Sequence, residues 1–245
     1  MIASTYRLCL LQVGIIIVTF WCADTVRADN TPSVPAFSAS YSVRYGLLRG
    51  EMSLALHHRD TGYTYETSLR PRGLASWLRR GEIREVSRLV LEGVGVRPLD
   101  YVATDTIARP SRSTEYYFDR SAGRVTGQYK SQTINVPIQA NGHNRVSVHV
   151  AIMRALQTGT ELSEVSVFDR GRWKDYAFEI VPDQSVETPS GRFDTVVVRY
   201  ASPDNKKSWS LHCAESLNYL PVMIVFREEG KVKSRAELTN YRVGN

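Results

Sequence analysis

The chain has 245 residues, of which 31 are basic and 25 acidic, and its net charge is +6. This length supports a sizeable hydrophobic core, and 42% hydrophobic residues exclude a disordered or low-complexity chain. The positive charge is weak and spread along the sequence, so it suits an anionic envelope surface at least as well as nucleic acid, and we expect no nucleic-acid partner.

Residues 1–28 are typical of a secretory signal peptide. Arg7 precedes an apolar run from Leu8 to Trp21, and Val26-Arg27-Ala28 places small residues at the two positions that a signal peptidase reads. We therefore expect cleavage after Ala28 and a periplasmic protein.

Two other fates of this leader stay open. An uncleaved membrane anchor would use the same apolar run, although the run is shorter than the roughly 20 apolar residues that cross a bilayer. A lipoprotein would need small residues ahead of Cys22, and the sequence there is Thr19-Phe20-Trp21. Cleavage after residue 28 would remove Cys9 and Cys22 and leave Cys213 alone, so no internal disulfide is expected.

Residues 29–36 contain two prolines and no periodic pattern, which predicts a disordered lead-in. From Phe37 onward apolar and polar residues alternate with a period of two, and turn residues interrupt the pattern at a spacing of about ten residues. The predicted strands after residue 81 cover 83–91, 97–105, 114–119, 124–129, 133–138, 164–169, 172–181, 184–187, 193–201, 207–213, 221–227 and 231–242. Hairpin turns are predicted at 120–123, 169–171, 189–191 and 229–230. No linker separates two halves, so residues 37–243 are expected to form a single β-rich domain.

One segment, at about residues 144–157, favours a helix. Its apolar residues on one helical face are Val146, Val150, Met153 and Leu156, and Asn144 is a candidate cap. The same segment also alternates through Val146, Val148, Val150 and Ile152, so a strand stays an alternative. The pattern predicts a mainly β fold, an antiparallel curled sheet or incompletely closed β-barrel wrapped around one central helix.

The C-terminal half carries an ordered set of features. After the helix come Gly159, the strand end Val167-Phe-Asp-Arg-Gly-Arg172, the hairpin 187–195, Trp209 and Tyr219-Leu-Pro-Val-Met-Ile224. In this order they resemble the bacterial exported family catalogued as domain of unknown function 3108, over roughly residues 38–243. The resemblance implies a β-rich envelope protein whose sheet spirals around a helix, and it brings no established activity and no catalytic residues. The segment Asn141-Gly-His143-Asn144 departs from the acidic residue and serine expected there.

The segment 70–80 is the strongest candidate for ligand binding. Leu74, Trp77 and Leu78 are spaced i, i+3, i+4, as on one face of a short helical turn, and Arg72, Arg79 and Arg80 flank them. Such a turn could lie on an anionic headgroup surface, as a peripheral membrane contact, or gate a cavity. The competing interpretation is a loop helix that closes one end of the barrel with its arginines in water.

No catalytic residue, metal ligand or cofactor is assigned. His57 and His58 are adjacent on a strand and therefore point to opposite faces, while His143 and His149 are six residues apart, unlike an i, i+4 metal pair. Cys213 shares a strand face with Trp209 and Leu211, which favours a buried hydrophobe over a nucleophile.

Three hypotheses of function follow. The first is an exported, non-enzymatic binding protein of the cell envelope that holds a lipid, acyl chain, envelope polymer or protein partner against a concave apolar face. The second is an envelope-polymer hydrolase or transferase, with a site assembled from His149, His212, Cys213 and Asp194. The third is a scaffold that binds another protein through an exposed apolar patch.

Overall fold

The computed structural model describes residues 34–244 except 74–75, 77–79 and 163. The strands of the first half are β1 (Phe37–Tyr45), β2 (Leu48–Arg59), β3 (Gly62–Arg72), β4 (Ile83–Glu92), β5 (Gly95–Pro98), β6 (Asp100–Asp105), β7 (Arg112–Asp119), β8 (Arg124–Tyr129) and β9 (Gln132–Pro137). Those of the second half are β10 (Gly142–Asn144), β11 (Glu164–Asp169), β12 (Arg172–Thr188), β13 (Gly191–Ala201), β14 (Lys207–Ala214), β15 (Leu220–Glu228) and β16 (Lys231–Val243). The helices are α2 (Ser147–Thr158) and the short 3-10 turn η1 (Glu215–Leu217).

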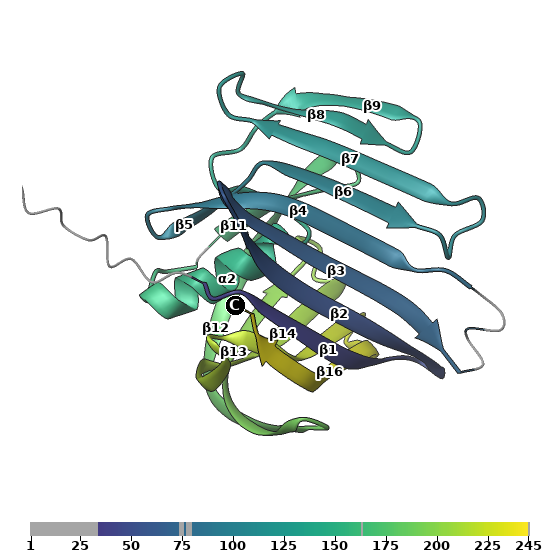
Figure 1. Ribbon diagram of the computed structural model, residues 1–245, viewed down its shortest axis with the longest axis vertical. Helices are drawn as coiled ribbons and strands as arrows, with labels where there is room; N and C mark the ends of the chain where they lie inside the picture. Colours follow the sequence, from purple (N-terminus) through teal and green to yellow (C-terminus); the bar gives the residue numbers. More distant parts are fainter. Residues whose placement is uncertain (1–33, 74–75, 77–79, 163, 245) are drawn as a thin grey trace, which may run out of the picture. The chain divides into compact units, whose positions relative to one another are not determined.

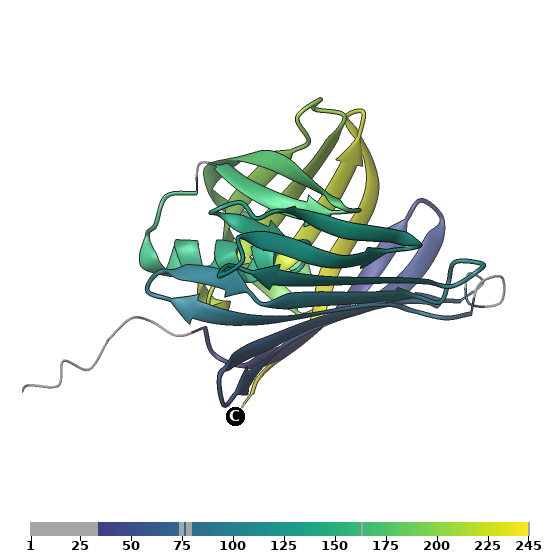
Figure 2. The ribbon, with the colours of Figure 1, turned by 90° about the horizontal axis from the view of Figure 1, so that it is seen from above.

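All the described strands belong to one 16-stranded sheet. The order runs β10-β11-β12-β13-β14-β15-β16-β1-β2-β3-β4-β6-β7-β8-β9, with β5 paired to β4. The pair β10–β11 is parallel and the other pairs are antiparallel. Because β16 pairs with β1, the two halves of the chain join in the middle of the sheet. Figure 1 shows this order, and Figure 2 shows β6–β9 and β11–β14 as two facing parts of a sheet that curls without closing.

Local turn chemistry is confirmed where the sequence predicted it. The predicted turns at 120–123, 169–171, 189–191 and 229–230 each connect neighbouring strands. At two of them, Arg170-Gly171 and Glu229-Gly230, both residues have positive φ, between 50° and 77°. A two-residue turn of this handedness matches the twist of the strands it connects, which is why glycine stands at its second position.

Two strand predictions differ from the structure. The predicted strand 97–105 is split at Leu99, because the carboxylate of Asp100 accepts the backbone N–H of Arg88 at 3.1 Å and thereby interrupts the ladder with β4. The predicted strands 172–181 and 184–187 form the single strand β12, in which the register shifts between Val181 and Gln184. This shift is a β-bulge, and a bulge bends the strand that carries it.

Helix α2 begins three residues later than predicted, because Asn144 belongs to strand β10. The side-chain oxygen of Asn144 nevertheless accepts the backbone N–H groups of Val146, at 3.1 Å, and Ser147, at 2.9 Å. Its amide nitrogen donates to Ser87 Oγ on β4 at 2.8 Å. Asn144 and Ser87 are both fully buried, so this one side chain connects the start of the helix to the sheet.

The helix packs against both facing parts of the sheet. Val148 and Ile152 contact a cluster formed by β11–β14, which includes Leu211 and Cys213. Val150 and Met153 belong to the larger cluster, which covers β1 to β9 and also includes residues of β11 and β14–β16. A helix surrounded in this way is buried on most of its circumference, which explains why both the helical and the alternating patterns of apolar residues appear in its sequence.

Side chains, not a hydrogen-bonded ladder, hold the two ends of the sheet together. Trp173 Nε1 on β12 donates to the carbonyl of Pro137 at 2.9 Å, and the backbone N–H of Gly171 donates to the hydroxyl of Tyr116 on β7 at 3.1 Å. The guanidinium of Arg145 lies 3.5 Å from Glu85 on β4 and 3.9 Å from Asp169 on β11. These contacts cross the opening that the sheet leaves.

The predicted leader and most of the lead-in fall on residues 1–33, outside the described residues, so cleavage after Ala28 stays a prediction, as does the single domain 37–243. Within the part of the chain that the structure describes, no helix is both long enough and apolar enough to cross a membrane.

The Asn144→Ala variant should lower the free energy of unfolding by about 3 kcal/mol, because it leaves buried backbone donors and Ser87 without their partner. Urea denaturation of the chain without residues 1–28 measures this. The matched control is Asn240→Ala on the exposed side of β16, which should change stability by no more than about 0.5 kcal/mol. Equal losses in the two variants would contradict the role given to Asn144.

Acid should destabilise the fold at pH values above those at which the carboxylates take up protons. Burial lowers the pKa of His143, His149 and His212 to about 4 each, against about 6.5 in an unfolded chain. Below pH 6.5 the unfolded chain therefore binds protons that the folded chain does not. The free energy of unfolding should fall from pH 6.5 to pH 5 by up to about 1.4 kcal/mol per pH unit for each histidine. The His143→Gln variant should show a shallower slope, and a stability independent of pH in this range would refute the burial of neutral imidazoles.

Candidate functional site

The hairpin of β12 and β13 is bent back over the sheet. Beyond the bulge at 181–184 the hairpin continues to a tip at Thr188–Gly191, where the backbone N–H of Ser190 donates to the carbonyl of Leu238 on β16 at 3.1 Å. In the sheet order β14 and β15 lie between β13 and β16. The far part of the hairpin, the curved green segment at the lower edge of Figure 1, therefore crosses one face of these two strands to reach β16.

A cavity of about 710 Å³ lies between this hairpin and β13–β16. Its apolar wall includes Val197, Met223 and Val225 from the sheet and Val186 from the hairpin. A volume of this size is typical of sites that bury a small molecule. The face that carries these residues is opposite to the face that packs on α2, because Leu211 and Cys213 contact the helix while their neighbours Ser210 and His212 line the cavity.

Cross-strand pairing gathers charge on this wall. Glu179, Arg199, Ser210, Val225 and Arg235 pair directly in one row across five strands. Directly opposed side chains on one face of a sheet lie within reach of each other. The row therefore brings two arginines that are far apart in sequence to the same cavity.

The arginines of the cavity differ in how firmly they are held. Arg227 donates to Ser210 Oγ at 3.2 Å, and Arg235 donates to Glu237 at 3.4 Å. Arg199 makes no side-chain hydrogen bond or ion pair among the described residues, and its side chain is exposed. Several guanidinium donors are thus free to receive an anion, and a guanidinium binds carboxylate and phosphate oxygens in a bidentate manner.

His212 occupies the next row of the wall, between Val197 and Met223. It is 8% exposed, and its Nδ1 is buried without a hydrogen-bond partner in the described part of the chain. Burial, together with the positive charges of Arg235, Arg227 and Arg199, lowers the pKa of His212 to about 4. The ring is therefore neutral at pH 7.

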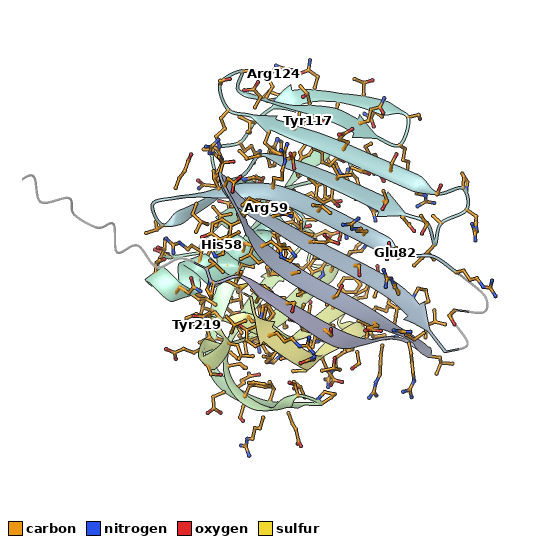
Figure 3. All side chains as sticks on the ribbon, viewed as in Figure 1. His58, Arg59, Glu82, Tyr117, Arg124 and Tyr219 are labelled. Atoms are coloured by element: carbon orange, nitrogen blue, oxygen red, sulfur yellow. The ribbon has the colours of Figure 1, made fainter. Side chains whose placement is uncertain are left out.

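The predicted ligand-binding segment does not line this cavity as far as the structure describes it. Leu74, Trp77, Leu78 and Arg79 lie outside the described residues. Arg72 is exposed and pairs with Glu51 on β2, and Arg80 is also exposed. Figure 3 labels Glu82, beside this segment, at the opposite end of the strands from His58 and Arg59. The role proposed for Arg72, Leu74, Trp77, Leu78, Arg79 and Arg80 stays a prediction.

The four candidates for an enzymatic site are not brought together. His149 lies on α2 with its ring centroid 6.4 Å from that of Tyr65. Cys213 is fully buried on the face of β14 opposite to His212, and burial raises the pKa of its thiol far above the ordinary value. Asp194 is exposed on the hairpin, opposite Ser185. No hydrogen bond joins any two of the four among the described residues.

A second, smaller hollow lies outside this cavity. A hollow of about 400 Å³ where β2 ends and β3 begins is lined by His58, Arg59 and Tyr63, and Figure 3 labels the first two. Across the described ranges no three His, Cys, Asp or Glu side chains are grouped in a way that could hold a metal ion.

Sequence reasoning named His212 but missed Arg199, Arg227 and Arg235. Each follows or precedes an apolar residue on its strand, as an ordinary solvent-facing residue does. Only the pairing register and the bent hairpin reveal that they share a cavity. The one local signal was the break at Pro182-Asp183, which predicted an interruption in the strand that bends.

A family model described as "Protein of unknown function (DUF3108)" matches residues 37–234. No curated protein matches the chain. Among solved structures, a β-barrel-like protein of the domain of unknown function DUF1849 from Brucella abortus matches with a TM-score of 0.58 and 10% identity, over 87% of this chain and 100% of that one. The MucA/MucB complex of Pseudomonas aeruginosa matches with a TM-score of 0.39 and 10% identity, over 89% of this chain and 54% of that one. The Brucella protein, at this identity, supports the fold alone.

The pKa of the His212 imidazole reports the positive charge of the cavity. Nuclear magnetic resonance titration of the imidazole should give a pKa near 4 in the free protein. The Arg235→Gln variant removes a neighbouring positive charge and should move this pKa toward 6.5 without reaching it, because burial remains. Arg112→Gln, on exposed β7, is the matched control and should leave the pKa unchanged. A His212 pKa near 6.5 in the unaltered protein would contradict the geometry described here.

Proposed function

The chain belongs to the DUF3108 family of proteins of unknown function, and we propose that it is an exported, non-enzymatic binding protein of the cell envelope that holds an anionic amphiphile in the cavity beneath the β12–β13 hairpin. The anionic group would lie against Arg199, Arg227 and Arg235, and an acyl chain would lie on the apolar wall.

One observation carries this proposal, namely that free cationic donors and an apolar wall share one cavity. Val197 and Val225 line the same cavity as Arg199 and Arg235, and Val225 pairs directly with Arg235 across the sheet. An apolar wall alone would serve any hydrophobic molecule, and cations alone would serve any anion. Their combination selects a ligand with one charged end and one apolar end, as envelope lipids have.

The location rests on the sequence of residues 1–28. Its basic start, apolar run and small residues before the expected cleavage point are the features that direct a chain out of the cytoplasm. In the envelope the protein would meet anionic lipids directly. A protein partner, the other ligand class considered from the sequence, would be the result if no lipid bound.

A hydrolase or transferase site would need at least two of the candidate catalytic side chains in one cleft. His212 reaches the cavity, whereas Cys213 lies on the other face of its strand and His149 lies on the helix. A neutral His212 among arginines supplies a hydrogen bond and no visible nucleophile to activate. Binding is therefore favoured over hydrolysis or transfer.

The proposal is tested by measuring affinity for short-chain phosphatidic acid and, as the neutral comparison, for a diacylglycerol of equal chain length. The charged lipid should bind and the neutral one should bind at least tenfold more weakly. The Arg227→Gln/Arg235→Gln double variant should weaken binding of the charged lipid about ten- to a hundredfold, since each lost charged hydrogen bond contributes about 1.5–3 kcal/mol before compensation.

Arg112→Gln keeps the same change of side chain away from the cavity and should bind like the parent protein. Lengthening the acyl chain should tighten binding by up to about 0.8 kcal/mol per methylene that reaches the apolar wall. If neither lipid bound, or if the double variant bound the charged lipid as well as the parent, the proposal would be abandoned.

A further inference from the structure

The cavity contains a feature that a site for any anion would not need, namely a buried neutral histidine among the arginines. His212 lines the cavity at 8% exposure, and its Nδ1 is buried without a hydrogen-bond partner among the described residues. A buried ring nitrogen without a partner costs free energy, because its hydration is lost and not replaced. A ligand that supplies the missing hydrogen bond would recover that cost.

The charged groups around His212 come from every strand of the wall. Arg199 stands on β13, Arg227 on β15, and Arg235 and Glu237 on β16, while Glu179 faces them from β12. Glu237 is held by Arg235 at 3.4 Å. The uncompensated charge is therefore positive, and it acts together with burial to keep the imidazole neutral while the cavity is empty. A bound anion would reverse this balance and favour the imidazolium.

Resting on the function proposed above, we infer that the anionic group of the ligand is a phosphate monoester, which shares one proton with His212. A phosphate monoester has three terminal oxygens for the guanidinium groups and a second pKa near 6. At neutral pH the free monoester is mostly the dianion, so its complex takes up one proton from solution. That proton lies either on a phosphate oxygen, which then donates a hydrogen bond to the neutral ring, or on the ring, which then donates to the phosphate. The proton moves between the phosphate oxygen and the imidazole nitrogen, and no covalent bond is made or broken.

Other anions cannot share a proton with His212 in this way. A phosphodiester or a carboxylate carries a single charge and no proton near neutral pH. Sulfate carries two charges but likewise brings no proton to share. These anions would meet the arginines and leave His212 without a partner, unless the ring took up a proton from water against the surrounding positive charge.

The test uses inorganic phosphate, sulfate and hexyl phosphate with the chain lacking residues 1–28. Calorimetry at pH 7.5 in two buffers of different ionisation enthalpy should show uptake of close to one proton when hexyl phosphate binds. The uptake should be smaller with inorganic phosphate, because part of the free ion already carries that proton at this pH. Magnetic resonance should show the pKa of His212 rising by at least two pH units in the phosphate complex. His212→Gln should abolish proton uptake and weaken phosphate about tenfold, while the weaker sulfate binding stays within about twofold. The melting temperature of this variant checks that it is folded, and the two measurements on the unaltered protein do not depend on it.

Each outcome decides one question. Phosphate binding without proton uptake, an unshifted His212 pKa, or sulfate bound as tightly as phosphate would overturn the inference, while phosphatidic acid binding would leave the proposed function standing. Tighter binding of hexyl phosphate than of inorganic phosphate identifies the headgroup of an amphiphile as the source. Equal binding of the two supports the shared proton and assigns the site to a free phosphate, against the proposed function. Binding of none of the three contradicts the inference.

Discussion

The amide of Asn144 is the point at which the helix and the curled sheet are joined. Its oxygen accepts the backbone N–H groups of Val146 and Ser147 at the start of α2. Its nitrogen donates to the hydroxyl of Ser87 on β4, and that hydroxyl donates to the carbonyl of Asp100 on β6 at 2.7 Å. A buried amide satisfied on both sides directs the helix between the facing parts of the sheet. The end strands β10 and β9 do not pair with each other, so side-chain packing around the helix holds the sheet in its curl.

The cavity follows from the same architecture. The inner face of β13 and β14 is occupied by α2, which leaves their outer face for the returning hairpin. The bulge in β12 bends that hairpin, and the bond from Ser190 to Leu238 fastens its tip to β16. The strand register then determines which side chains face the space between the hairpin and the sheet. Arg199, Arg227 and Arg235 are free to face a ligand because the core of the fold is built on the opposite face.

What could be predicted from sequence was the local part of the structure. The turns Arg170-Gly171 and Glu229-Gly230 are set by residues that tolerate positive φ, and the alternation from Phe37 onward requires only one buried face. The start of α2 was displaced because β10 pairs with β11, some twenty residues away, and no local pattern records that pairing. The arginine row is harder still, since it depends on the registers of successive strand pairs and on a bend in β12. A charged residue in an alternating strand has the same sequence pattern whether it faces open water or a covered cavity.

In the proposed function, the space beneath the β12–β13 hairpin holds an anionic amphiphile. A crystal structure of the protein purified from its own host under mild conditions tests this most directly. We expect elongated electron density along Val197 and Val225 that ends in a compact group against Arg199, Arg227 and Arg235. Well-ordered water alone in that space, in protein that has never been exposed to strong detergent or denaturant, would contradict it.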